Sequence, residues 1–158
     1  MSTVAPNTSE ALEAAVIARL QARMPEVETE AFPDDPEEYR LNHPTGALLV
    51  RYHGGKYSPP KSAHLMVQER SLAVEITLVF RSLNGKEGVK AYLEAVRLAL
   101  AGFKPPAFDK LKPIGEEFIS QGGGEWRYAI DFVTGTTVVE EVEPEPVLGA
   151  AVGKVSLM

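Results

Sequence analysis

The stretch QERSLAVEITLVFRSL, residues 68–83, decides the fold because apolar and polar side chains alternate along most of it. Alternation with a period of two is typical of a strand that buries one face of a sheet. The apolar set that we expect in a core beneath helices is Leu72, Val74, Ile76, Leu78 and Phe80. The other face is too mixed for a second core and too apolar in part for a purely solvated surface. It therefore predicts a contact surface between subunits.

The alternating segment is also unusually long. It begins near His64 and continues to Arg81, on the order of 60 Å of extended chain, whereas ordinary strands have about 5 or 6 residues. This length predicts a bend, or an arm that projects from the domain. The contact residues predicted on this segment are Glu69, Arg70, Ser71, Glu75, Thr77 and Arg81. We expect charge reversal at Arg70 and Glu75 to leave the monomer folded and to impair assembly.

Two segments with a helical period flank the strands. The first covers residues 8–24, with a hydroxyl side chain to cap it and a proline directly after it. The second follows Asn84, a suitable N-cap with Glu87 three residues on, and ends before Gly102, where a C-terminal cap belongs. The apolar faces are Leu12, Val16, Leu20 and Met24 in the first, and Val89, Tyr92, Leu93, Val96 and Leu100 in the second.

Shorter strands are predicted at residues 27–32 and 47–52, and the second is followed by a glycine- and proline-rich loop at 53–60. IGEEFIS and EWRYAIDFVTG, joined by QGGG, predict a hairpin. The fold class is therefore α+β, a mainly antiparallel sheet with two helices packed on one face and a long β-hairpin or arm. We expect one domain over residues 1–137 and an acidic, partly flexible tail over 138–158.

Composition excludes several classes of protein. With 158 residues, 44% hydrophobic and 24% charged, the chain suits one globular domain, and its lack of cysteine excludes disulfides and thiolate metal sites. A net charge of −6 and a pI near 5.1 disfavour general binding to nucleic acid. No apolar stretch approaches the roughly 20 residues that span a bilayer, so we expect no membrane partner.

The search for chemistry predicts no catalytic, cofactor-binding or metal-binding residue. The three histidines, His43, His53 and His64, stand singly and lack the spacing of metal ligands. HGGKYS lacks the register of a phosphate-binding loop, and no serine lies in a nucleophile motif. We therefore expect no enzyme.

Two charged surface groups are candidates for contacts between copies of the chain. A small basic group surrounds the prolines after the second helix: Lys104, Lys110 and Lys112. An acidic loop follows the first predicted strand and carries Asp34, Asp35, Glu37 and Glu38. The lysines of one copy can pair with the acidic loop of the next, although exposed ion pairs contribute only about 0 to 1 kcal/mol each.

Four stretches in this order resemble the small tail terminator proteins encoded by Mu-like phages and prophages. They are EAFPDDPEEYRLNHPTGALLVRYHGGKYSPP (30–60), QERSLAVEITLVFRSL (68–83), GFKPPAFDKLKPIGEEF (102–118) and EWRYAIDFVTGTT (125–137). The resemblance covers roughly residues 30–137, and the order of elements is more distantly similar to that of the lambda-type tail terminator. These motifs concern packing and loops, so the specificity comes from their occurring together.

The resemblance implies a structural protein of the virion tail that is assembled in the host cytoplasm. Its copies form a ring, typically a hexamer, on the head-proximal end of the tail tube. The ring stops polymerisation of the tail tube protein and offers a surface to a head completion or connector protein. Phage DNA passes through without sequence-specific binding, and acidic-loop side chains that face the channel would repel it.

Two alternatives from other classes remain open. One is a non-catalytic small-ligand or regulatory α+β module that acts as a dimer. The other is an enzyme in which carboxylates of the acidic loop hold a divalent metal ion, although the loop lacks the spacing of a calcium-binding loop.

Overall fold

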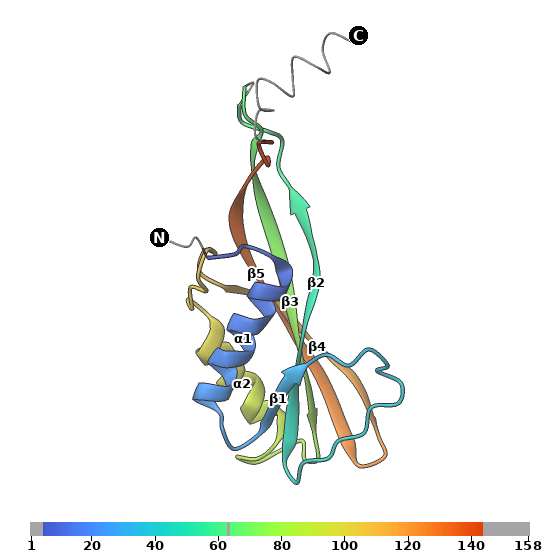
Figure 1. The fold of residues 1–158 in the computed structure, drawn as a ribbon. Coiled ribbons are helices and arrows are strands. Elements are labelled where there is room, and N and C mark those ends of the chain that lie inside the picture. The colour runs from blue at the N-terminus through green and yellow to red at the C-terminus, as the bar shows by residue number, and fades with distance from the viewer. Residues whose placement is uncertain (1–4, 63, 144–158) are drawn as a thin grey trace.

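The computed structural model describes residues 5–62 and 64–143 and confirms the α+β class. A five-stranded sheet has the strand order β1-β2-β3-β5-β4; β1 runs parallel to β2 and all other neighbours are antiparallel. Both helices cover one face of this sheet (Figure 1). The elements are α1 (Ser9–Arg23), β1 (Glu28–Ala31), β2 (Gly46–Tyr57), β3 (Val67–Phe80), α2 (Val89–Leu100), β4 (Lys112–Gly122) and β5 (Glu125–Val139).

The central strand β3 has the predicted core face. All five apolar side chains expected beneath the helices, Leu72 to Phe80, are fully buried. The predicted faces of α1 and α2 pack on them, and the ring of Phe80 lies 4.7 Å from that of Tyr92 in α2. Burial of the Tyr92 hydroxyl and its hydrogen bond to the Glu26 carboxylate raise the pKa of Tyr92 to about 12. The alternation therefore identified the core correctly.

The start of α2 differs from the prediction. The helix begins at Val89 with Gly88 as its N-cap, and no side chain caps it, so the prediction of Asn84 as N-cap is wrong. Gly85 has a φ of +85°, which a helix cannot contain, and the amide of Gly88 donates back to the carbonyl of Gly85 at 3.1 Å. The capping pattern of residues 84–87 therefore lies in a turn that precedes the helix.

The predicted loop at residues 53–60 is wrong over residues 53–57, because β2 continues to Tyr57. A bulge interrupts the pairing between Tyr52 and Gly54, and Gly54 adopts a φ of +148°. The Glu13 carboxylate of α1 accepts the Tyr52 amide hydrogen at 2.6 Å, which satisfies the backbone at this irregularity. A Cβ at Gly55 would collide with the carbonyl of Ser71. Here the glycines permit a bulged strand and close strand pairing.

The predicted arm is present. The end of β2, the start of β3 and the end of β5 project beyond the helices as a three-stranded extension (Figure 1). The guanidinium of Arg70 lies 5.7 Å from the ring centre of Tyr52 and 5.3 Å from that of Tyr57. Such cation–π contacts stiffen the extension where the helices no longer support it. Residues 144–158 of the predicted tail lie outside the described residues, and the predicted domain end at residue 137 falls inside β5.

The predicted hairpin is confirmed as β4 and β5. Its turn residues Gly123 and Gly124 have φ values of +60° and +75°, as a tight two-residue turn with left-handed residues requires. Ile130 and Phe132 of β5 are buried in the core beneath the helices. In the part of the chain that the structure describes, no helix is long and apolar enough to span a bilayer.

Candidate assembly interface

The outer strand β4 is the most exposed regular element of the fold. All eleven of its residues are exposed, because β4 pairs only with β5 on one side and the helices pack on the other four strands. Three large apolar side chains stand in the open: Ile114 is 60% exposed, Phe118 52% and Ile119 48%. A long edge strand with apolar side chains is an unfavourable surface for a protein that stays alone. This makes β4 a candidate contact strand, which the sequence analysis did not identify.

The face of the sheet opposite the helices is partly covered, which corrects the prediction that it is too mixed for a second core. The chain between β1 and β2 folds over it, and Leu41, Leu49 and Val79 form a small buried cluster there with Ala47. Glu125 fastens this segment, since its carboxylate accepts the amide hydrogen of Leu41 at 2.9 Å. The alternating pattern could not show this cover, because it is supplied by a loop distant in sequence.

On the same face, Glu75 and Thr77 are also buried inside the subunit, with 7% and 8% of their surfaces exposed. Glu75 accepts two hydrogen bonds from Arg51 at 2.8 and 3.1 Å, both at Oε1. Charge reversal at Glu75 is therefore expected to act on the stability of the subunit as well as on assembly. The predicted role of Glu75 and Thr77 as contact residues has a structural alternative. Both side chains can instead stabilise the sheet face opposite the helices within one subunit.

We expect Glu75→Lys to lower the free energy of unfolding by about 2 kcal/mol or more, because it removes a buried partner of Arg51 and adds a second cation. Urea denaturation measures this change. The control is Glu116→Lys on exposed β4, for which we expect a change within about 0.5 kcal/mol. Equal effects of the two variants would show that Glu75 has no supporting role in the subunit.

The other predicted residues of the long strand also have partners within the subunit. Glu69 accepts hydrogen bonds from Lys61 at 3.2 Å and from Thr137 at 3.0 Å, and these bonds hold the pKa of its carboxyl below the usual value. Arg81 donates to backbone carbonyls of the loop before β2. Ser71 is half-buried in the arm. These side chains brace the arm and the loop, and parts of each stay accessible.

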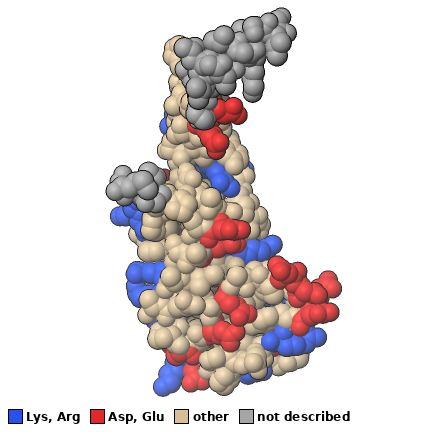
Figure 2. Space-filling model, in the orientation of Figure 1, with Lys and Arg blue, Asp and Glu red and all other residues tan. Residues whose placement is uncertain are grey.

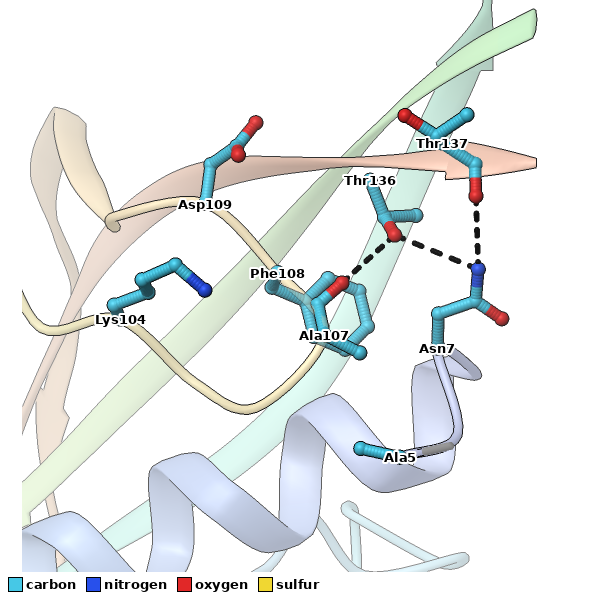
Figure 3. A pocket seen from close by; sticks show the side chains of 8 residues that line it. All are labelled: Ala5, Asn7, Lys104, Ala107, Phe108, Asp109, Thr136 and Thr137. Carbon is cyan, nitrogen blue, oxygen red and sulfur yellow. Dashed lines mark hydrogen bonds between the residues drawn. The ribbon is translucent and has the colours of Figure 1, made fainter. Parts of the chain in front are cut away.

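The three predicted lysines are exposed and lie near the base of the arm. Lys104 borders a hollow of about 450 Å³ beside Asp109, and Figure 3 shows both side chains with Asn7 and Thr136. Thr136 donates to the carbonyl of Ala107 at 2.8 Å, which supports the unusual φ of +71° at that alanine. The hollow is open to solvent, and Asn7 and Thr136 form hydrogen bonds across part of it. It therefore forms no enclosed site.

The acidic loop lies at the other end of the subunit. Asp34, Asp35, Glu37 and Glu38 are all exposed. Figure 2 shows acidic side chains gathered at the right of the view, where Figure 1 places this loop. Lys112 is the first residue of β4 and pairs with Val133. The acidic loop is held by the hydrogen bond between Leu41 and Glu125, and Glu125 pairs with Gly122 at the other end of β4. Opposite charges at opposite ends suit contacts between successive copies better than contacts within one.

A charge cluster lies on the sheet face opposite the helices (the open face), and the sequence did not predict it. Glu75 pairs in register with Arg51 on β2 and with Asp131 on β5, and the bulge brings His53 beside them. The Nδ1 atom of His53 lies 3.5 Å from Glu75 Oε2 and 3.7 Å from Asp131 Oδ1. Burial raises the pKa of Asp131, and the nearby Glu75 carboxylate raises it further. These are the described residues best placed to hold a metal ion.

The cluster adjoins a pocket of about 350 Å³. Its lining residues include Phe32 and Tyr39 from the covering loop and Ile119 of β4. The guanidinium of Arg51 lies 5.1 Å from the ring centre of Phe32. Burial and the charge of Glu30 raise the pKa of Tyr39 to about 12, so its hydroxyl stays neutral at ordinary pH. The pocket therefore combines apolar walls with charged groups, as small-molecule sites do.

Comparison with known proteins gives one family and a shared fold. The model of the family described as Gp37 protein matches residues 16–151. A chain in the virion of a native gene transfer agent particle matches with a TM-score of 0.50 and 16% sequence identity, and the match covers 84% of this chain and 98% of that chain. No curated protein matches the chain. At this identity the structural likeness concerns the fold alone.

Proposed function

Because the chain belongs to the Gp37 protein family, we propose that it is a structural protein of a phage-type virion, and more specifically a tail terminator. In this role, copies of the chain assemble as a ring, a hexamer, on the head-proximal end of the tail tube. The ring stops further addition of the tail tube protein and offers its outer surface to a head completion or connector protein. The shared fold with a chain from a gene transfer agent virion, which spans 98% of that chain, supports the proposal.

The observation that carries the assembly role is the exposed edge strand β4. A ring needs a heterologous contact, in which one patch of each subunit meets a different patch of the next. Ile114, Phe118 and Ile119 provide exposed apolar side chains along this strand for the first contact. The arm provides a second surface, distant from the first along the sheet (Figure 1). A subunit with two such separate surfaces can bind a neighbour and the tube end at the same time.

The charges fit the same arrangement. In this proposal the acidic loop faces the channel, where its carboxylates repel the phosphates of passing DNA. Lys104, Lys110 and Lys112 lie on the side that meets the neighbouring subunit. The proposal assigns no catalytic step to any residue, and it places the protein in the tail after assembly in the host cytoplasm.

The test is electron microscopy of the full chain mixed with purified tail tubes of the same virus. We expect extra density at one end of each tube, and no further growth when tube subunits are added. Tubes without the protein should keep growing at the same end. Bare ends and continued growth in the mixture would contradict the tail terminator role.

A second candidate is a non-catalytic ligand-binding or regulatory module that acts as a dimer. The specific observation in its favour is the pocket of about 350 Å³ on the open face, which lies within the size range of small-molecule sites. A native mass of two subunits, together with thermal stabilisation by a metabolite, would favour this candidate. A chain that is monomeric in solution and assembles only at tube ends would favour the tail terminator role.

A further inference from the structure

Three side chains of types that bind metal ions meet on the open face of the sheet, one from each of three neighbouring strands. They are His53 of β2, Glu75 of β3 and Asp131 of β5, and one potential ligand atom from each lies within 4.8 Å of the others. No other group of this kind occurs among residues 5–62 and 64–143. We propose that these three residues bind one divalent transition-metal ion, such as Zn²⁺. This proposal is independent of the tail terminator role.

The distances suit a small metal ion. Bonds of about 2.1 Å in a tetrahedral site place neighbouring ligand atoms about 3.4 Å apart. The Nδ1 atom of His53 lies 3.5 Å from Glu75 Oε2 and 3.7 Å from Asp131 Oδ1. Shifts of a few tenths of an ångström therefore bring both pairs to bonding geometry. A water molecule can supply the fourth ligand from the solvent side.

The ligand atoms are also free of competing hydrogen bonds. Glu75 has a side chain that is only 9% exposed, and its hydrogen bonds from Arg51 and Thr77 all reach Oε1. Its other oxygen, Oε2, faces His53. Asp131 Oδ1 is a buried atom without a hydrogen-bond partner in the described residues. Buried polar atoms without a partner are costly, and a bound cation would satisfy both carboxylates.

Arg51 is the obvious competitor, because its guanidinium already neutralises part of the charge. It binds only Oε1, however, and its position against Phe32 holds it to one side of Glu75. A hydrogen bond to the second oxygen of a ligating carboxylate is a common support in metal sites. Among the described residues Arg51 forms its ion pair with Glu75, and Asp131 Oδ1 has no hydrogen-bond partner. Arg51 therefore orients Glu75 and leaves room for a cation.

Access and ligand type indicate which ion fits. The side chain of His53 is 49% exposed, so the ion can enter from solvent without opening the fold. An imidazole nitrogen with two carboxylates suits Zn²⁺, Co²⁺ or Ni²⁺ better than Mg²⁺ or Ca²⁺, which prefer all-oxygen sites. The sequence offered no ligand spacing, because the three residues are 22 and 56 positions apart and meet only through strand pairing.

The test is calorimetric titration of the metal-free full chain with Zn²⁺, and separately with Mg²⁺, at neutral pH. We expect one Zn²⁺ per chain and binding of Mg²⁺ at least about a hundredfold weaker. His53→Gln and Asp131→Asn should each weaken Zn²⁺ binding by at least about tenfold. His64→Gln is the matched control, because His64 is an exposed histidine outside the cluster, and it should bind like the original chain.

Circular dichroism should show the same fold for all three variants, because His53 is half exposed and Asp131→Asn keeps the shape of the side chain. Absence of stoichiometric Zn²⁺ binding would overturn the proposal and leave the cluster as an internal ion-pair group. Equal weakening by His64→Gln and His53→Gln would also overturn it. Cobalt absorption bands of a four-coordinate site that vanish in His53→Gln would support it directly.

Discussion

Under the proposed tail terminator role, replacing Ile114 and Phe118 with glutamate should abolish the capping of tail tubes while the subunit still folds. Both side chains are more than half exposed on the edge strand, so the substitution adds little strain within the subunit. In a ring contact the new carboxylates would lose their water without a partner, at a cost of several kcal/mol. The measurement is the fraction of tube ends that carry extra density in electron micrographs. We expect this fraction to fall to the level of tubes alone.

The matched control for this variant is Leu98→Glu. Leu98 lies on α2, on the opposite side of the sheet from the charge cluster, and is 61% exposed. The Leu98→Glu variant should cap tubes like the original chain. The loss of the contact between Phe118 and Tyr128, whose ring centres lie 5.4 Å apart, should cost the β4 variant only about 1 kcal/mol in stability. Normal capping by the folded β4 variant would exclude β4 from the assembly contacts.

Among the substitutions considered, Phe80→Ala should lower the free energy of unfolding most, by about 3–5 kcal/mol. The ring of Phe80 is fully buried, stacks near Tyr92 and fills the space that the missing side chain of Gly46 leaves open. Removing it leaves a cavity that neither α2 nor the neighbouring strand can close. For a domain of this size the melting temperature should fall by roughly 10 °C.

Thermal and urea denaturation measure the effect of Phe80→Ala, and Leu98→Ala on the exposed side of α2 is its control. The control should change stability by less than about 0.5 kcal/mol. A loss below about 1 kcal/mol in Phe80→Ala would mean that the core at this end of β3 is loosely packed. The tail terminator proposal would be unaffected, because it rests on surface features.

Most secondary structure followed from the sequence because it depends on local periods and on turn chemistry. The apolar set of residues 72–80, both helix faces and the glycine turn at 123–124 all follow from neighbours within a few positions. The errors share a different cause. Asn84 satisfied the capping pattern, but the positive φ of Gly85 keeps residues 84–87 out of the helix. Gly54 and Gly55 suggested a loop, but β2 continues through a bulge at this point because it stays paired with β3.

Which surfaces stay exposed depends less on local sequence. The sequence identified the acidic loop and the three lysines as exposed, since charged side chains near prolines rarely find a core. It did not identify β4 as the exposed edge, because which strand lies at the edge depends on the order of the whole sheet. It assigned Glu75 to a contact surface, a prediction that stays open, and it did not show that Glu75 is buried beside Arg51 within the subunit.

By itself, then, the sequence determined which side of each strand and helix is apolar, and therefore the α+β class and the core of this protein. Periodicity carries that information because a side chain's direction depends on its neighbours along the chain. Only the tertiary structure decided what covers the second face of the sheet, which edge stays open and that His53, Glu75 and Asp131 meet. Those outcomes depend on pairing between strands far apart in sequence, and no local pattern encodes it.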